Sequence, residues 1–127
     1  MNAIRVNVKK DKYDIYIGRH EDPEIGKFGN PFSHKPNSLA LYITRNRSCS
    51  ITYFKQFLIE GINFLIRIGI EKDSKLFNDL MIKRDIILKD MHIMKGKRIA
   101  CFCSKEEKCH GDVYIDLLKE SNTYSLF

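Results

Sequence analysis

The sequence has no continuous apolar run long enough to cross a membrane. Its most apolar stretch, residues 57–70, is interrupted by a glutamate, an asparagine and an arginine, which excludes a membrane span. Residues 1–10 alternate polar and apolar side chains and lack the apolar segment of a secretory signal, so we expect a cytoplasmic protein. Internal repeats and low-complexity tracts are absent too, which predicts one domain over residues 1–127.

The composition is typical of a soluble globular protein, with 43% hydrophobic and 30% charged residues. A formal net charge of +6 favours anionic partners such as nucleotides, nucleic acid or phosphorylated metabolites. The lysines and arginines are scattered among acidic residues and form no basic block. Charge alone therefore does not separate a nucleic-acid surface from an ordinary solvated one.

Only four cysteines are present, and three of them fall within residues 101–109. In a chain expected in a reducing compartment, this clustering favours thiol or metal chemistry over a disulfide framework. Cys49 stands apart, and we expect it to be an ordinary buried or half-buried thiol.

Period-two alternation predicts short strands at residues 4–8 and 13–17, and an apolar run without breakers predicts another at 99–103. Residues 18–38 are rich in Gly, Pro, Asn and His without a period, and are predicted to form a loop. Such long loops are uncommon in small domains, so we expect this stretch either to be a functional lid or to contain a short element of secondary structure. Residues 39–44 fit a helix or a strand.

Apolar residues spaced three and four apart predict a helix that starts at Ser50, with Ser48 or Ser50 as its N-cap. A second helix is predicted over residues 75–90, and a last one from about Cys109. These elements predict a small α/β domain, with a mostly parallel or mixed sheet of three to five strands flanked by helices in a Rossmann-like arrangement of two or three layers.

The long helical connection between strands 13–17 and 99–103 is what a parallel pair requires, and such crossovers are nearly always right-handed. If these strands are neighbours, the loops after them leave at the same carboxyl edge of the sheet, where open α/β sheets bind ligands. The Gly-rich loop and the Cys-His loop are therefore expected to face one pocket.

The segment CFCSKEEKCH, residues 101–110, carries the clearest chemistry. Cys101 and Cys103 lie two apart on a predicted strand and point to the same side. Cys109 precedes the last helix, whose unpaired N–H groups favour a thiolate. We therefore predict Cys101 or Cys109 as a reactive thiol, and His110 as its proton acceptor or donor.

Two other interpretations of this segment remain open. One is a zinc site with the ligands Cys101, Cys103, Cys109 and His110. Structural zinc usually takes Cys-x₂₋₄-Cys pairs, so a Cys-x-Cys spacing on a strand and an adjacent Cys and His fit a tetrahedron less well. The other is that Cys101 and Cys103 are small apolar core residues, which explains the Cys-His pair poorly.

The Gly-rich loop offers groups suited to holding an anion. Gly29 can adopt a positive φ, and Pro31 keeps Asn30 extended, which fixes backbone amides and the asparagine side chain in one arrangement. Gly18 and Arg19, directly after the second strand, offer a close backbone approach and a guanidinium suited to phosphate or carboxylate. Residues of these types are also common in ordinary turns and surface ion pairs.

Three motifs in order, YIGR at 16–19, GNPF at 29–32 and CFCSKEEKCHGD at 101–112, resemble the uncharacterised family called domain of unknown function 4326. Members are small proteins of bacteria, phages and large DNA viruses, so a viral source would imply the host cytoplasm. Phe28 and Phe102 stand where the family often has tryptophan. The resemblance implies that the functional positions include Gly18, Arg19, Gly29, Asn30, Pro31, Cys101, Cys103, Cys109, His110 and Asp112.

The last motif is also similar to a second uncharacterised family, domain of unknown function 488, which has Cys-x₇-Cys-His-Arg after a strand. Cys101, Cys109 and His110 match this pattern. Gly111 replaces the arginine, and Cys103 has no counterpart. This likeness implies that Cys103 is dispensable, and it disfavours a four-ligand metal site.

Neither family supplies a reaction. The leading hypothesis is a pocket that binds or acts on a nucleotide-like or other anionic small molecule, without a cofactor. The protein would then be a nucleotide- or nucleic-acid-modifying enzyme. Cys101 or Cys109 would react with His110 as proton carrier, and Arg19 and Asn30 would hold the ligand. A second hypothesis is a zinc-stabilised module that binds nucleic acid without catalysis. A third is a viral interaction protein that sequesters a ligand.

Overall fold

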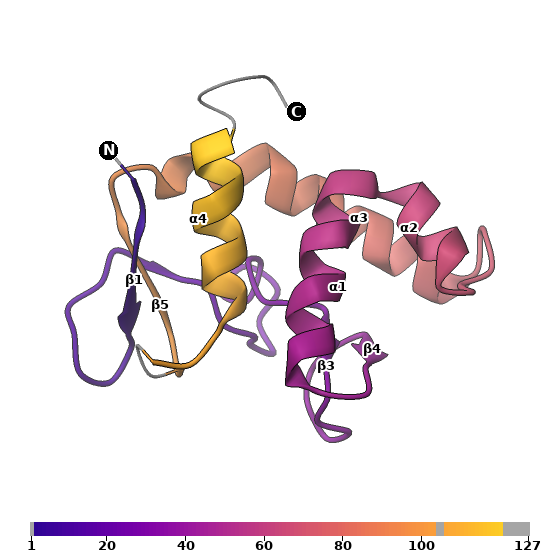
Figure 1. The fold of residues 1–127 in the computed structure, drawn as a ribbon, viewed down its shortest axis with the longest axis horizontal. Helices are drawn as coiled ribbons and strands as arrows, with labels where there is room; N and C mark the ends of the chain where they lie inside the picture. Colours follow the sequence, from indigo (N-terminus) through magenta and orange to yellow (C-terminus); the bar gives the residue numbers. More distant parts are fainter. Residues whose placement is uncertain (1, 104–105, 121–127) are drawn as a thin grey trace.

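The computed structural model describes residues 2–103 and 106–120, which form four α-helices and short parallel strands in two small sheets (Figure 1). The predicted α/β class is thereby confirmed. The elements in chain order are β1 (Ile4–Asn7), β2 (Ile15–Tyr16), β3 (Phe32–Ser33), β4 (Tyr42–Ile43), α1 (Arg47–Glu60), α2 (Ile62–Arg67), α3 (Lys75–Asp90), the 3₁₀ helix η1 (Met91–Met94), β5 (Arg98–Cys101) and α4 (His110–Glu120).

The main sheet has the strand order β1-β5-β2, and both pairs are parallel. β5 lies in the middle, and its residues Ile99, Ala100 and Cys101 are buried, as expected for a central parallel strand. The predicted parallel pairing of the second strand with the C-terminal strand is confirmed, with Tyr16 opposite Ala100. β5 is shorter than predicted, since it ends at Cys101 rather than at residue 103.

α4 stands between the main sheet and α1, and the second sheet lies at the N-terminal end of α1 (Figure 1). In that sheet β3 and β4 run parallel, with Phe32 opposite Tyr42. Residues 18–38 therefore contain a short strand, Phe32–Ser33, which is one of the two alternatives expected for this stretch. A strand of two residues is too short to show a period in the sequence.

α1 begins three residues before the predicted start, because Asn46 caps it. The Asn46 side chain accepts a hydrogen bond from the Cys49 N–H at 2.8 Å. The prediction of Ser48 or Ser50 as the cap is wrong, since Ser50 lies inside the helix and its hydroxyl donates to the Arg47 carbonyl at 2.8 Å. The earlier start makes Arg47 the first residue of the helix.

The other two long helices match their predicted positions. α3 spans the residues predicted for it, and the Ser74 hydroxyl caps it by accepting from the Phe77 N–H at 3.2 Å. α4 begins at His110, directly after Cys109. Among the described residues, no helix combines the length and apolarity that a membrane crossing needs.

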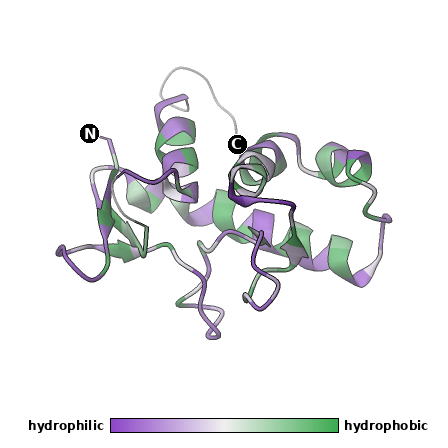
Figure 2. Ribbon diagram, turned by 60° about the horizontal axis from the view of Figure 1, so that its bottom comes forward, coloured by the Kyte–Doolittle hydropathy of each residue, from purple (hydrophilic) through white to green (hydrophobic). Residues whose placement is uncertain are grey.

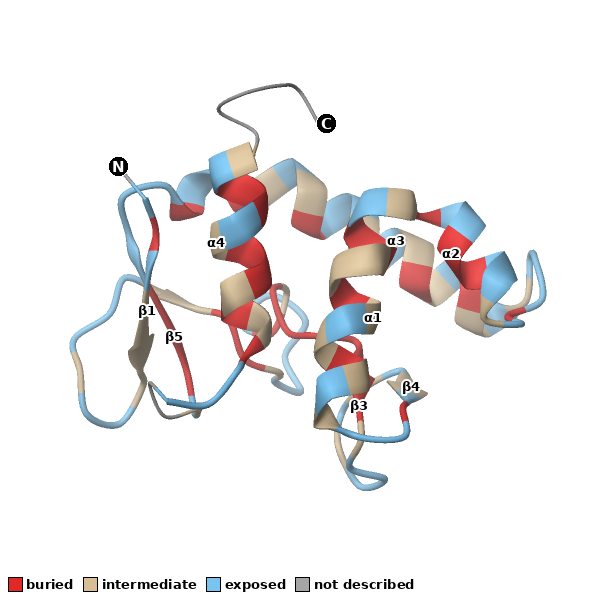
Figure 3. Ribbon diagram, viewed as in Figure 1, coloured by how far each residue is buried: buried red, intermediate tan, exposed pale blue. Residues whose placement is uncertain are grey.

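Aromatic rings fill the core beside α1. Phe32 packs edge-on against the rings of Tyr42, Tyr53, Phe57 and Phe64, at centroid distances of 5.3 to 6.2 Å. Buried residues recur on successive turns of α1 and α4 (Figure 3). Apolar residues alternate with hydrophilic ones along the helices (Figure 2). This packing holds α1 against the second sheet and against α4, which in turn packs on the main sheet.

Candidate functional site

A cavity of about 420 Å³ lies where the carboxyl edge of the main sheet meets the starts of α1 and α4. The Gly-rich loop contributes Asn30 to its wall, and the Cys-His loop contributes Cys109 and His110. The two loops that the strand order predicted to face one pocket therefore do so, although they are distant in the sequence. A volume of this size suits a small-molecule site.

Three sulfur atoms gather at one side of the cavity. The Sγ atoms of Cys101, Cys103 and Cys109 all lie within 4.8 Å of one another, and those of Cys101 and Cys109 are 3.2 Å apart. A fully extended strand would separate side chains two residues apart by about 6.7 Å. The sulfurs come closer because β5 ends at Cys101 and the chain bends after it.

Each sulfur atom has a hydrogen-bond donor beside it, and two of the donors are arginines from other parts of the fold. Arg47 Nη2 donates to Cys103 Sγ at 2.9 Å, and the Gly111 N–H donates to Cys109 Sγ at 3.4 Å. Cys101 is a hydrogen-bond partner of the Arg5 guanidinium. The two arginines are held in turn by carboxylates, since Arg5 Nε pairs with Asp112 at 3.1 Å and Arg47 Nη1 with Glu107 at 3.1 Å.

These contacts divide the negative charge unequally among the thiols. Hydrogen bonds from Cys101 and Cys109, together with the nearby Arg47 guanidinium, hold the pKa of Cys103 well below its ordinary value. The same sulfur contacts, together with burial, raise the pKa of Cys109, and the pKa of Cys101 is also raised. The favoured thiolate is thus Cys103, a residue that the sequence predicted as a ligand-binding position and, in the alternative interpretation, as a zinc ligand.

His110 is held in one orientation beside the sulfurs. Its Nε2 lies 2.6 Å from the Ile17 carbonyl oxygen, and its Nδ1 lies 3.5 Å from Cys109 Sγ. Burial lowers the pKa of the imidazole to about 4, so the ring is neutral at pH 7. A neutral ring that donates from Nε2 to a carbonyl keeps a lone pair on Nδ1, and that lone pair faces Cys109.

Arg19 brings a positive charge to the cavity wall. Its Nη1 donates to the carbonyl oxygens of Asn30 at 3.0 Å and Phe32 at 3.4 Å. Among the ion pairs within residues 2–103 and 106–120, none involves this guanidinium. Burial lowers the pKa of Arg19, but an arginine remains charged at any physiological pH. The cavity therefore contains a cation that no carboxylate of the described residues neutralises.

Asn30 lines the cavity, but its side chain bonds to the protein itself. Its Oδ1 accepts from the Phe32 N–H at 2.9 Å, and its Nδ2 donates to the Ser50 carbonyl at 3.2 Å. The asparagine thus ties the Gly-rich loop to α1, and in this way it fixes the main chain that holds Arg19. Its predicted role as a direct ligand contact stays a prediction.

The other predicted positions in the Gly-rich loop shape its backbone. Gly18 lines the cavity, whereas Gly29 and Pro31 do not. Gly29 does not adopt a positive φ. A Cβ at this position would lie 2.9 Å from Arg19 Cα, so glycine allows the backbone at residue 29 to approach the backbone at Arg19. The Pro31 carbonyl accepts hydrogen bonds from the N–H groups of Leu41 and Tyr42, which join β3 to the start of β4.

Asp112 also lies away from the cavity lining. Its carboxylate accepts from the Cys109 N–H at 3.2 Å and from Arg5 Nε at 3.1 Å, so it caps the start of α4 and positions a sulfur donor. These two hydrogen bonds explain structurally why an aspartate stands at this position of the motif.

Sequence reasoning missed two arginines of this site. Arg47 was not placed at a helix start because the cap of α1 was predicted at the wrong residue, and Arg5 lies on a strand whose face could not be assigned. The sequence RNR just before the first predicted helix was the available signal for Arg47, since a guanidinium suits the recognition of anions. Tyr16, His34 and Lys35 also line the cavity.

Comparisons with known proteins found no match among curated proteins and none among solved structures. One family model matches, and it covers residues 4–120. The match includes all the cavity-lining loops described above, and it agrees with the resemblance carried by the YIGR, GNPF and Cys-His motifs. The chain belongs to the family described as Domain of unknown function (DUF4326).

Proposed function

We propose that the cavity binds a small anionic ligand of nucleotide type, with Arg19 as the partner of its phosphate or carboxylate. The observation that carries this proposal is the Arg19 guanidinium, which is partly buried in the cavity wall and has no ion-pair partner in the described residues. Burying a charge without a partner is costly, so a site of this kind is stabilised by an incoming anion.

The surroundings of Arg19 add to the positive potential. Lys35 and Arg47 line the same cavity, although Glu107 pairs with Arg47. The N-terminal ends of α1 and α4 meet here, and their unpaired N–H groups and dipoles favour negative charge. An anion in the cavity would thus interact with several positive groups at once.

Aromatic rings at the same site suit the base of a nucleotide. Phe102 lines the cavity and is 61% exposed, an unusual state for a phenylalanine. Its ring packs edge-on against Tyr16, with centroids 6.1 Å apart, and Lys9 Nζ lies over the ring at 5.6 Å from its centroid. Much of the ring is open to solvent and so to contact with a base. A phosphate on Arg19 and a base on Phe102 would be recognised within one cavity.

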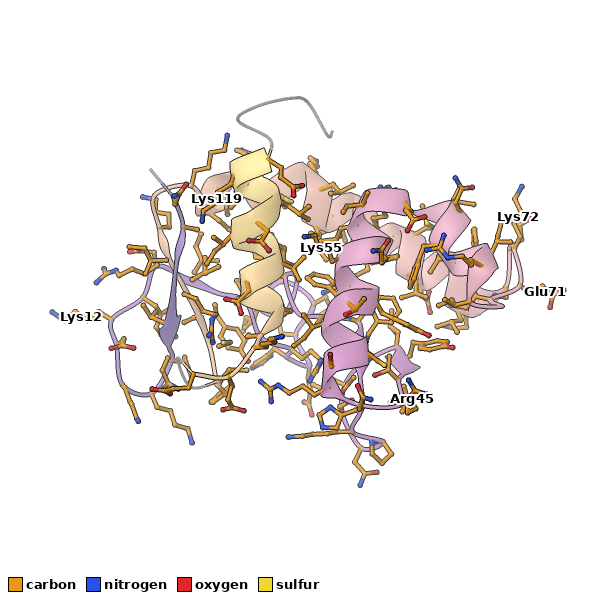
Figure 4. The ribbon with its side chains drawn as sticks, viewed as in Figure 1. Lys12, Arg45, Lys55, Glu71, Lys72 and Lys119 are labelled. Atoms are coloured by element: carbon orange, nitrogen blue, oxygen red, sulfur yellow. The ribbon has the colours of Figure 1, made fainter. Side chains whose placement is uncertain are left out.

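The cysteines and His110 line this cavity too, so a ligand held by Arg19 would lie beside them. This arrangement supports chemistry on the ligand, as in a nucleotide-modifying enzyme. A sequestering protein would use the same cavity without turnover, and product analysis after incubation separates the two. A nucleic-acid-binding module is supported less, because Lys12, Lys72 and Lys119 project from separate parts of the molecule (Figure 4).

Calorimetric titration of the full chain with nucleoside mono-, di- and triphosphates and with inorganic phosphate tests the proposal. Replacing Arg19 with Gln removes a charge-assisted contact worth about 1.5–3 kcal/mol, which weakens binding about tenfold to a hundredfold. Arg98→Gln is the matched control, since Arg98 is exposed and pairs with Asp14 at the opposite end of β5. Equal affinities for both variants, or no binding of any nucleotide by the wild type, would refute the proposal.

A further inference from the structure

We infer that Cys101, Cys103 and Cys109 form a zinc site in which the fourth coordination position opens into the cavity. The three Sγ atoms lie within 4.8 Å of one another and come from two segments that the fold brings together. Thiolates are preferred zinc ligands, and with Zn–S bonds of about 2.3 Å the sulfurs around one tetrahedral ion lie about 3.8 Å apart, which is inside this limit. The site does not depend on which anion the cavity binds.

The main argument from the sequence against a zinc site was the Cys-x-Cys spacing on an extended strand, and the observed geometry removes it. A Cys-x-Cys pair on an extended strand would hold its sulfurs too far apart, but here the strand ends at Cys101. The bend after it turns Cys103 back toward the other sulfurs, and Cys109 approaches from the start of α4. A strand end and a helix start thus supply the three ligands.

The donors around the sulfurs fit thiolates better than neutral thiols. Arg47 Nη2 lies 2.9 Å from Cys103 Sγ, and the Gly111 N–H lies 3.4 Å from Cys109 Sγ. Arg5 is a hydrogen-bond partner of Cys101, and its side chain is mostly buried. N–H donors of this kind orient metal-bound thiolates and spread their negative charge, as outer-shell groups do in known metal sites.

The fourth ligand position faces the cavity because all three cysteines line it. His110 Nδ1 lies 3.5 Å from Cys109 Sγ but is not part of the mutually close group of ligand atoms. Its Nε2 is hydrogen-bonded to the Ile17 carbonyl, so the ring would lie next to the ion without being one of its ligands. Three protein ligands and an open position are the pattern of catalytic zinc, where water or a ligand atom completes the tetrahedron.

Zinc binding releases up to three thiol protons to solvent as the three sulfurs form bonds to the ion, with no change in oxidation state. The resulting centre would polarise a ligand atom or bound water next to the anion held by Arg19. The thiols would then act as metal ligands, and the reacting group would be the zinc-bound water or ligand.

Elemental analysis of the full chain, purified without chelators, tests this inference. We expect about one zinc per chain in the wild type and in Cys49→Ser, the matched control whose sulfur lies outside the cluster. Cys103→Ser should lose most of the metal. His110→Gln should keep it, and a loss equal to that of Cys103→Ser would overturn the open fourth position.

Thiol counting in the wild type keeps the test independent of variants that fail to fold. With a thiol-specific chromogenic reagent, we expect one fast-reacting cysteine before addition of a strong chelator and further reactive cysteines after it. Folded, metal-free protein that takes up no zinc when one equivalent is added would overturn the site. Because neither experiment uses a nucleotide, failure here and failure of anion binding at Arg19 are separate results.

Discussion

Replacing Asn30 with Ala is predicted to destabilise the fold far more than an asparagine-to-alanine change on the surface. Asn30 is 4% exposed, and its side chain makes two hydrogen bonds that join the Gly-rich loop to α1. The change leaves the Phe32 N–H without its acceptor inside the core. It also removes the extra donor from the Ser50 carbonyl, which keeps its partner within the helix.

The magnitude follows from these two losses. An unsatisfied buried N–H costs about 1–3 kcal/mol, and the lost bond to Ser50 adds about 1 kcal/mol, which gives about 2–4 kcal/mol in the free energy of unfolding. This is a large part of the stability of a typical domain. Urea unfolding followed by circular dichroism, with linear extrapolation to water, measures the difference.

Asn46→Ala provides the control, because Asn46 caps α1 through one exposed hydrogen bond to the Cys49 N–H. The loss of such a cap costs about 1 kcal/mol. If Asn30→Ala costs no more than Asn46→Ala, the buried hydrogen bonds of Asn30 do not hold the loop, and the reasoning that connects this loop to Arg19 is refuted.

Three further predictions concern stability. Tyr114→Phe removes the buried hydrogen bond from Tyr114 Oη to the Phe28 carbonyl, 2.7 Å long, and should cost about 1–3 kcal/mol in urea unfolding; a cost near zero would show that the carbonyl finds another donor. Burial lowers the pKa of Lys83 from 10.5 to about 8, so between these two pH values the unfolded state binds more protons than the folded state. The free energy of unfolding should therefore rise with pH across this window, by about 1 kcal/mol after allowance for solvent screening. Lys83→Met should lack that rise, and identical pH profiles of the two proteins would contradict it. Gly29→Ala places a Cβ 2.9 Å from Arg19 Cα and should cost about 1–3 kcal/mol while also weakening nucleotide binding; normal affinity would mean that Arg19 tolerates the shift.

The sequence predicted the main sheet better than the small one. A parallel pair requires a long crossover, and the helices between β2 and β5 supply one, so the order of the elements along the chain favoured this pairing. β3 and β4 have two residues each and carry no period. Their positions depend on Phe32, whose burial among aromatic rings from α1 and α2 is a tertiary effect.

The candidate site was predicted in outline for the same reason. The rule that ligands bind at the carboxyl edge placed the Gly-rich and Cys-His loops together. The sequence could not show that β5 ends at Cys101, and for this reason it left open whether Cys103 lies close enough to the other sulfurs to share a metal ion with them. Arg5 and Arg47 were missed because their contacts with the cysteines join segments far apart in the chain.

Mapping a bound nucleotide by amide chemical shifts in the ¹⁵N-labelled full chain tests the central claim most directly, namely that the two loops form one anion-binding site. Addition of a nucleoside monophosphate to saturation should shift the amides of Arg19, Ser33, Cys103 and His110, while those of α2 stay unchanged. Shifts confined to one loop, or spread over α2 and α3 with none at Arg19, would contradict the account.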